Sequence, residues 1–397
     1  MIQTVLFRFH NICQRTDKFN KEEQIDIAEE IKKELNSRGE WNEYNELPLE
    51  ELKDKSKKDK GAKRVLRISK ILRCDNYGKI ELNCKTLTPL FIYGANNNLE
   101  IRSSSIKGLM RFWWRAANCH RYNSISEMRK EEAKIFGRFY KEEGKDKNIK
   151  SKFTVLVEMI KEKIAECNPN NNKSEINEKY LFYSKASIPN NDKFYKPGTA
   201  FKISFIFKNK DKNIINEVLK TFKILMLFGG MGTRSRKGGG NFIVTDCKGI
   251  DEFNISFPEY YTFEEIKKFY NGIIDNHKMN SNLTKKISNL AEGNIFKFRT
   301  EKKQNILKEM ENKYEEFRGN KKLAELVGFG IPVNKLNKKY QNNNNRFPSK
   351  VIFKIMELEK NEQFGYFIKL GGEILTDNKS DEVDKTLNEF LYNNNNS

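Results

Sequence analysis

The sequence lacks the residue patterns that most catalytic and metal sites need. Its 397 residues include only three histidines, which lie far apart, and six cysteines that form no CxxC or related spacing. A zinc-type site of clustered His and Cys is therefore not expected. The chain also has no G-x-S-x-G nucleophile motif and no G-x-x-x-x-G-K-[ST] phosphate loop. We expect no catalytic residues, no metal site and no cofactor.

Long apolar runs are missing as well. No run approaches the roughly 18 residues that a membrane helix needs, and the N-terminal residues lack the basic and apolar regions of a signal peptide. Scattered cysteines without a disulfide pattern are typical of a reducing compartment. We therefore expect a cytoplasmic protein that does not bind membranes.

What the sequence has in excess is positive charge. Its 74 Lys and Arg against 54 Asp and Glu give a formal charge of +20 at pH 7, which favours polyanionic partners, with nucleic acid ahead of a membrane surface. However, the basic residues are 57 Lys and only 17 Arg, and the chain also holds 47 Asn. An A/T-rich genome gives this bias without selection for binding, so the placement of the charge is more informative than its total.

Apolar periodicity predicts an α+β protein. Strands are expected at 79–90, 153–159, 180–183, 201–207, 241–247, 351–358 and 366–370. Helices are expected at 103–122, 126–136, 213–228, 262–274, 300–326 and 381–392. Residues 79–250 then follow the strand–helix–strands–helix–strand order of a ferredoxin-like domain, and the pattern partly recurs in 251–397. We predict two domains with these boundaries, after an N-terminal extension over 1–78.

The segment 101–126 contains basic residues but no acidic one. On a helix, Lys107, Arg111 and Arg115 are spaced i, i+4 and i+8, so they form a cationic stripe. Trp114 lies beside this stripe, whereas Trp113 belongs to the apolar face. Guanidinium groups next to an aromatic ring hold phosphates and stack on unpaired bases. The pattern favours phosphate contact; the alternative is that the tryptophans are core residues and the arginines are solvated or form salt bridges.

A second segment without acids, GGMGTRSRKGGG at 229–240, combines six glycines with three cations. Glycines let backbone N–H groups approach a ligand closely, so the segment is suited to wrapping a phosphate backbone. A flexible hairpin without a ligand is the alternative. Arg should persist in a Lys-rich chain where a planar fork is needed, and 101–121 and 232–240 together hold six of the 17 arginines.

These two segments resemble a known family. TLTPLFIYGANNNLEIRSSSIKGLMRFWWRAA (86–117) and GGMGTRSRKGGGNF (229–242) are similar to signatures of the RAMP proteins of CRISPR systems. The first closely resembles a motif of the first-numbered RAMP subunit of the type III-B Cmr effector complex. AKIFG (133–137) and RFPSKVIFKIMEL (346–358) fit the same family.

The resemblance implies two tandem ferredoxin-like, RRM-type domains with insertions, in a non-catalytic RNA-binding subunit of that ribonucleoprotein. Such a subunit holds the 3′ part of the crRNA and helps capture complementary target RNA in antiviral defence. Its implied partners are crRNA, single-stranded target RNA and the other Cmr subunits. The motif match assigns RNA contact to Arg102, Ser104, Ser105, Lys107, Arg111, Trp114, Arg115, Gly229, Gly230, Gly232, Arg234, Arg236 and Lys237.

Two other functions stay open. One is a metal-independent RAMP endoribonuclease that processes CRISPR transcripts, for which His120 is the nearby candidate base. The other is a scaffold that contacts only protein. Residues 1–78 depart from the family pattern, and we expect them to form an arm that docks on another subunit.

Overall fold

The computed structural model describes most of the chain after residue 78 and a few residues before it. The described residues are 31–33, 35–37, 39, 55–63, 65–66, 78–94, 98–142, 145–166, 176–182, 193–207, 211–250, 253–274, 281–302, 305–321, 326–330, 348–360, 362–372 and 380–395. The chain forms two compact units, 1–78 with 208–210, and 79–207 with 211–397. In the smaller unit the described residues are mostly helical. The strands and helices discussed below belong to the larger unit.

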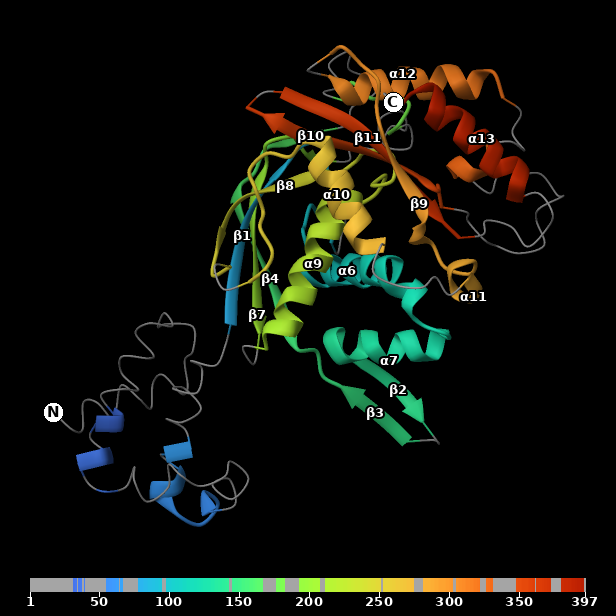
Figure 1. Cartoon of the computed structure of the whole chain (residues 1–397). Coiled ribbons are helices and arrows are strands. Elements are labelled where there is room, and N and C mark those ends of the chain that lie inside the picture. Colours follow the sequence, from blue (N-terminus) through green and yellow to red (C-terminus); the bar gives the residue numbers. More distant parts are fainter. Residues whose placement is uncertain are drawn as a thin grey trace. The chain divides into compact units, whose positions relative to one another are not determined.

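The first sheet has four strands and two helices in the predicted chain order. The elements are β1 (Gly78–Thr86), α6 (Ser103–Asn118), β4 (Phe153–Lys161), β7 (Ala200–Phe207), α9 (Lys212–Phe228) and β8 (Phe242–Lys248). The strands lie in the order β4-β7-β1-β8 (Figure 1), and the β1–β8 and β4–β7 pairs are antiparallel. This is the topology of a ferredoxin-like domain, so the predicted α+β class is confirmed.

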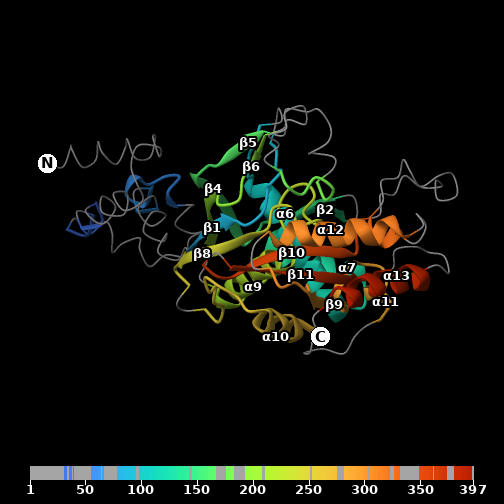
Figure 2. The same cartoon turned by 90° about the horizontal axis from the view of Figure 1, so that it is seen from above.

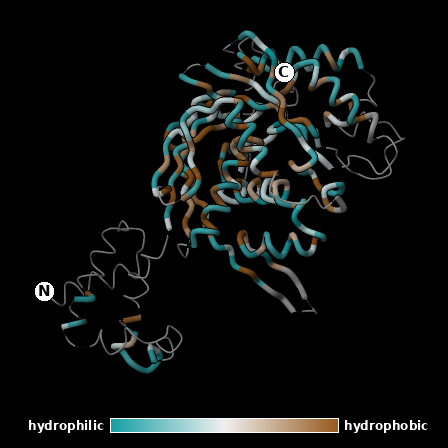
Figure 3. Tube along the Cα trace, in the orientation of Figure 1, coloured by the Kyte–Doolittle hydropathy of each residue, from teal (hydrophilic) through white to brown (hydrophobic). Residues whose placement is uncertain are grey.

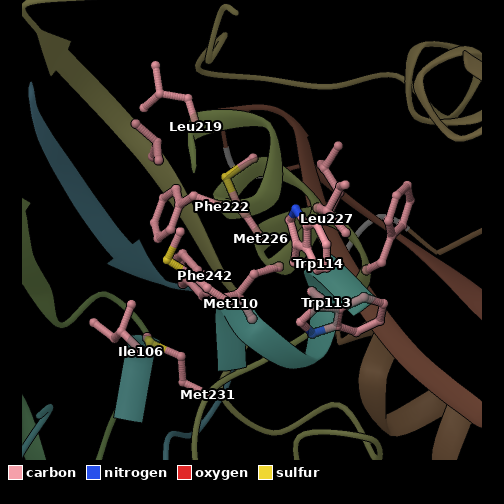
Figure 4. Packing of buried hydrophobic residues seen from close by; sticks show 14 of the residues in the cluster. Ile106, Met110, Trp113, Trp114, Leu219, Phe222, Met226, Leu227, Met231 and Phe242 are labelled. Carbon is pink, nitrogen blue, oxygen red and sulfur yellow. The ribbon is translucent and has the colours of Figure 1, made fainter. Parts of the chain in front are cut away.

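Alternation of side chains gives this sheet one buried face. Ile80, Leu82 and Cys84 of β1 are buried, while the residues between them are partly exposed, as the two-residue period of a strand requires. Helices α6 and α9 supply the other side of the core, in which Trp113 and Trp114 lie close to apolar residues of α9 (Figure 4). In Figure 3 hydrophobic residues recur along the strands and helices that enclose this core.

The second sheet repeats this pattern with three strands. The elements are β9 (Asn289–Lys297), α12 (Ile306–Gly319), β10 (Val351–Glu359), β11 (Glu362–Gly371) and α13 (Ser380–Asn393). The strand order is β10-β11-β9, and both pairs are antiparallel. After α13, Asn395 forms an antiparallel bridge with Phe298, directly after β9. In a complete ferredoxin-like sheet, a fourth strand would pair with the first strand, here β9, at this edge. Among the described residues, this one bridge stands in the place of that fourth strand.

The remaining elements are shorter helices and strands around these two sheets (Figure 2). They are η3 (Cys119–Arg121), α7 (Ile125–Phe136), β2 (Arg138–Glu142), β3 (Lys145–Ile149), β5 (Ile164–Glu166), β6 (Lys193–Tyr195), α10 (Phe263–Ile274), α11 (Ser281–Thr284) and η4 (Val327–Phe329). Strands β2 and β3 form an antiparallel hairpin, and β5 pairs with β6. Among the described residues, no helix is long and apolar enough to cross a membrane.

The two sheets share one core. The main apolar cluster contains residues of β1, α6 and α9 together with Ile352, Tyr366 and Ile368 of the second sheet. The hydroxyl of Tyr366 also donates a hydrogen bond to the carbonyl oxygen of Leu227 at 2.5 Å. The predicted boundary at residue 250 lies between β8, the last strand of the first sheet, and β9, the first strand of the second sheet. Both sheets belong to one compact unit.

Several expected elements differ from the structure. The strand predicted at 180–183 is wrong, because Tyr180 and Leu181 lie in a turn and their backbone N–H groups donate to the carboxylate of Glu311 in α12. The helix expected over 300–326 is shorter, since α12 spans Ile306–Gly319. The β2–β3 hairpin and β9 were not expected, because their sequences do not alternate clearly between apolar and polar residues.

Candidate nucleic-acid interface

Helix α6 has one buried face and two other sides, of which one carries the predicted cationic stripe. It begins after Arg102, which has extended backbone angles and makes no side-chain cap. No acidic residue lies in its first turn, and Ile106, Met110 and Trp113 are buried. Ser105, Leu109 and Phe112 are spaced i, i+4 and i+7, so they share one side of the helix. The predicted cationic stripe follows a different side.

Trp114 belongs to the core. Its side chain is only 2% exposed, and the indole Nε1–H donates a hydrogen bond to Oε1 of Glu217 in α9 at 2.8 Å. The ring also lies 6.1 Å from that of Tyr122. A nucleic-acid base could stack on Trp114 only after the indole ring had left this position. Both tryptophans are therefore core residues, as the alternative to phosphate contact proposed.

Lys107 and Arg111 bind residues that flank the β2–β3 hairpin. Nζ of Lys107 donates to Oγ of Ser151 at 2.6 Å and to the carbonyl oxygen of Phe153 at 3.0 Å. Nη2 of Arg111 donates to the carbonyl oxygens of Phe136 and Gly137 at 2.8 and 2.6 Å. Burial, followed by the charge of Arg111, lowers the pKa of Lys107 to about 8. These two cations already have protein partners on the α7 side of the helix.

Glu132 of α7 supplies the carboxylate that the sequence around the stripe lacks. One of its oxygens lies 2.8 Å from Nη1 of Arg111 and the other 3.4 Å from Nη1 of Arg115. The carboxylate is buried, whereas the two guanidinium groups are partly exposed. The arginines therefore form salt bridges and still have open edges.

The glycine-rich segment 229–240 is a closed, ordered loop. The N–H of Met231 donates to the carbonyl oxygen of Gly240 at 3.0 Å, and the N–H of Gly240 donates to that of Pro89 at 2.8 Å. A Cβ on Gly240, where φ is +61°, would lie 2.1 Å from the Met231 carbonyl oxygen. The glycines thus let the chain pack on itself, and the structure does not favour the flexible hairpin.

Two cations of this loop point into the second sheet region. Nζ of Lys237 is buried, donates to the hydroxyl of Tyr314 at 2.9 Å, and lies over the rings of Tyr314, Phe329 and Phe353 at 4.3–5.5 Å. Burial holds its pKa well below the ordinary value. Nη1 of Arg236 donates to the carbonyl oxygen of Ser349 at 2.5 Å. Lys237 is therefore held inside the protein, away from any RNA surface.

A pocket of about 290 Å³ lies where α6 meets this loop and strand β10. It is lined by Leu109, Phe112, Trp113, Gly229, Gly230, Ser235, Arg236 and Ile352. The guanidinium of Arg236 lies 5.4 Å from the centre of the Phe112 ring. Burial lowers the pKa of Arg236 to about 10, so this group is cationic at neutral pH. The pocket thus combines an aromatic ring, a cation and a hydroxyl.

The structure divides the predicted site residues into groups. Gly229, Gly230 and Arg236 line the pocket. Arg102 and Ser104 are exposed and Ser105 half-buried at the start of α6, and Gly232 and Arg234 are half-buried in the loop. The remaining four, Lys107, Arg111, Arg115 and Lys237, are bound to protein partners described above, and Trp114 is in the core.

Sequence reasoning missed five of the pocket residues, which are Leu109, Phe112, Trp113, Ser235 and Ile352. The spacing of Leu109 and Phe112 from Ser105 on α6 was a usable signal. His120 is only 1% exposed. Of the described cysteines, Cys84, Cys119 and Cys247 are free, and the described residues contain no His, Cys, Asp and Glu group that could hold a metal ion.

Comparison with known proteins addresses the family. Residues 83–243, which run from β1 to β8 and include α6 and the loop, match the family model of the RAMP superfamily. The predicted resemblance to RAMP proteins is confirmed. A relative from Pyrococcus furiosus, CRISPR system Cmr subunit Cmr1-2, is 27% identical over 183 aligned residues, and the match covers 40% of this chain and 91% of the relative.

Solved structures show the same fold. The apo crystal structure of Cmr1 from Pyrococcus furiosus matches 79% of this chain and 97% of its own, with 19% identity and a TM-score of 0.54. A chain in a cryo-EM structure of the type III-B Cmr-β complex, bound to cognate target RNA and AMPPnP, matches 79% of this chain and 98% of its own, with 16% identity and a TM-score of 0.51. The fold shared with these structures therefore extends beyond the segment that the family model matches.

Proposed function

We propose that this chain is an RNA-binding subunit of a type III-B Cmr effector ribonucleoprotein. The observation that carries the proposal is the pocket in which α6 and the glycine-rich loop meet. These two segments have no acidic residue of their own, and the RAMP superfamily match covers both. The likeness to Cmr1 and to a chain of the Cmr-β complex supports the kind of assembly.

The pocket is suited to one unpaired nucleotide. Its volume of about 290 Å³ is near the lower end, about 300 Å³, of small-molecule pockets. Phe112 offers a ring face on which any base can stack, and Arg236 and Ser235 offer donors to a phosphate. Arg102, at the start of α6, is exposed and free of acidic neighbours in the first turn, so it is suited to the adjoining phosphate.

The finer role follows from the same contacts. Stacking and phosphate contacts read little sequence, which suits a subunit that must accept any spacer. We propose that it holds the 3′ part of the crRNA, helps capture complementary target RNA in antiviral defence, and contacts other Cmr subunits, with residues 1–78 as a docking arm. The exposed edges of Arg111 and Arg115 extend the proposed RNA surface along α6. We assign target cleavage to other subunits.

A salt-dependence experiment tests RNA binding. The affinity of the full chain for a fluorescein-labelled oligouridine is measured at several salt concentrations. The wild type should lose affinity as salt increases, and Arg236→Ala should weaken binding to all sequences and lower the slope by about one unit. Phe112→Ala should weaken binding by about 1–3 kcal/mol without changing the slope.

Arg129→Ala is the matched control, since Arg129 is an exposed arginine on α7, outside the pocket. Arg129→Ala should change the oligouridine affinity and its salt dependence only by the small amount that the loss of one distant surface charge gives. A wild-type affinity that does not depend on salt would contradict RNA binding and favour the protein-only scaffold.

The endoribonuclease remains the second candidate, but the structure offers it less support. His120 is buried in η3, so RNA cannot reach it without a rearrangement. Incubation of the purified chain with repeat RNA in EDTA separates the two functions. Specific cleavage that is lost in His120→Ala would overturn the non-catalytic role.

A further inference from the structure

A buried lysine of the second sheet contacts the wall of the RNA pocket. Lys354 of β10 is completely buried, and its Nζ donates hydrogen bonds to the carbonyl oxygens of Met226, at 2.9 Å, and of Gly229. Met226 is in the last turn of α9, and Gly229 is both the C-cap of α9 and a residue of the pocket lining. One ammonium therefore joins the helix end, the start of the loop and the second sheet.

Helix α9 needs such a group because its own last turn contains no basic residue. The last carbonyl groups of a helix are unpaired and carry a partial negative charge of about half an electron. Left alone, this charge would repel a phosphate bound beside Gly229. The hydroxyl of Tyr366 satisfies the Leu227 carbonyl, and Lys354 satisfies two others and brings a positive charge.

We infer that Lys354 is a positioning residue of the pocket whose ammonium fixes Gly229 and favours a bound phosphate, so that RNA binding takes up a proton at Lys354. This inference rests on the proposed function. Lys354 does not touch the RNA; it acts through the helix end and through its charge.

Burial also makes the charge of Lys354 sensitive to pH. Burial lowers the pKa of Lys354 to about 7, so the free protein holds a mixture of amine and ammonium near neutral pH. A phosphate in the pocket favours the ammonium and raises this pKa, and binding then takes up a proton. By reciprocity, affinity is highest below pH 7 and falls as pH rises through about 7.

Other titratable groups around Lys354 do not explain such a change. Its cross-strand neighbour Tyr366 has a pKa raised well above its ordinary value by burial and, secondarily, by Tyr261, so it stays neutral. Arg236 stays cationic at neutral pH. Lys237, at the far end of the loop, has a pKa held well below its ordinary value. A Lys237 variant is therefore included in the test, to separate its protonation from that of Lys354.

The test compares wild type and Lys354→Met for oligouridine binding at constant ionic strength. The wild-type dissociation constant should rise about fivefold from about pH 6.5 to about pH 8.5, whereas Lys354→Met should bind weakly with little pH dependence. Lys350→Met is the matched control: Lys350 is another buried lysine of this region, paired with Asp384, and it does not line the pocket. Both Lys350→Met and Lys237→Met should keep the wild-type dependence.

Calorimetry of the wild type keeps the inference testable if Lys354→Met fails to fold. Titration of oligouridine near pH 7 in buffers of different ionisation enthalpy should report proton uptake, and Phe112→Ala, which weakens the pocket, should reduce uptake and affinity together. Salt-dependent binding without proton uptake, or the wild-type pH dependence in a folded Lys354→Met, would overturn the role of Lys354 and leave the proposed function intact. No binding at any pH would instead overturn the proposed function.

Discussion

The contact between α7 and the basic helix can be tested by changing Glu132 to Gln. The carboxylate of Glu132 is buried and lies 2.8 Å from Nη1 of Arg111 and 3.4 Å from Nη1 of Arg115. Gln has almost the same shape, so the change removes one negative charge and leaves the packing unchanged. It also turns an acceptor-only group into one whose amide N–H₂ faces two guanidinium donors.

The magnitude follows from these contacts. A hydrogen bond to a charged group contributes about 1.5–3 kcal/mol, and the longer Arg115 contact adds less. Breaking a fully buried ion pair costs about 3–5 kcal/mol, but here the guanidinium groups can turn towards water. We expect Glu132→Gln to lower the free energy of unfolding by about 2 kcal/mol.

Urea denaturation followed by tryptophan fluorescence measures this loss, because Trp113 and Trp114 lie on the same helix. Glu131→Gln is the control: Glu131 pairs with Lys134 on the surface of α7, and an exposed pair of this kind contributes at most about 0.5 kcal/mol. Equal losses in the two variants would refute the role of Glu132. RNA affinity should rise in Glu132→Gln if the arginine edges contact RNA, because two cations lose their counter-charge.

Three further substitutions have defined outcomes. Gly240→Ala, at φ +61° and with a backbone oxygen 2.1 Å from the new Cβ, should lower the melting temperature and weaken oligouridine binding, since the backbone must move. Trp114→Phe removes the hydrogen bond to Glu217 and should cost about 1–3 kcal/mol in urea denaturation with unchanged RNA affinity. The unfolded chain binds a proton at Lys237 more readily than the folded chain does, so the contribution of Lys237 to stability should increase with pH up to its ordinary pKa of 10.5. Melting experiments should show a weaker increase of stability with pH in Lys237→Met than in the wild type.

Local patterns were sufficient to predict much of the first sheet. The alternation of Ile80, Leu82 and Cys84 predicted β1, and the apolar spacing of 103–122 and 213–228 predicted α6 and α9. These elements bury one face, and burial of one face leaves a period in the sequence. The turn at Tyr180 and Leu181 had no such signal, because their backbone N–H groups are satisfied by Glu311, about 130 residues further along the chain.

The sequence by itself identified two segments without acidic residues, a helix and a glycine-rich loop, and their resemblance to RAMP proteins. Tertiary structure alone decided what each cation in them does. Arg111 contacts α7, Lys107 contacts Ser151 and the start of β4, Lys237 lies among three aromatic rings, and only Arg236 of these four lines the pocket. The physical reason is that the effect of a cation depends on its partner, and these partners lie on other elements. Lys354 and Gly229, for example, are 125 residues apart, and local spacing along the chain cannot predict such a contact.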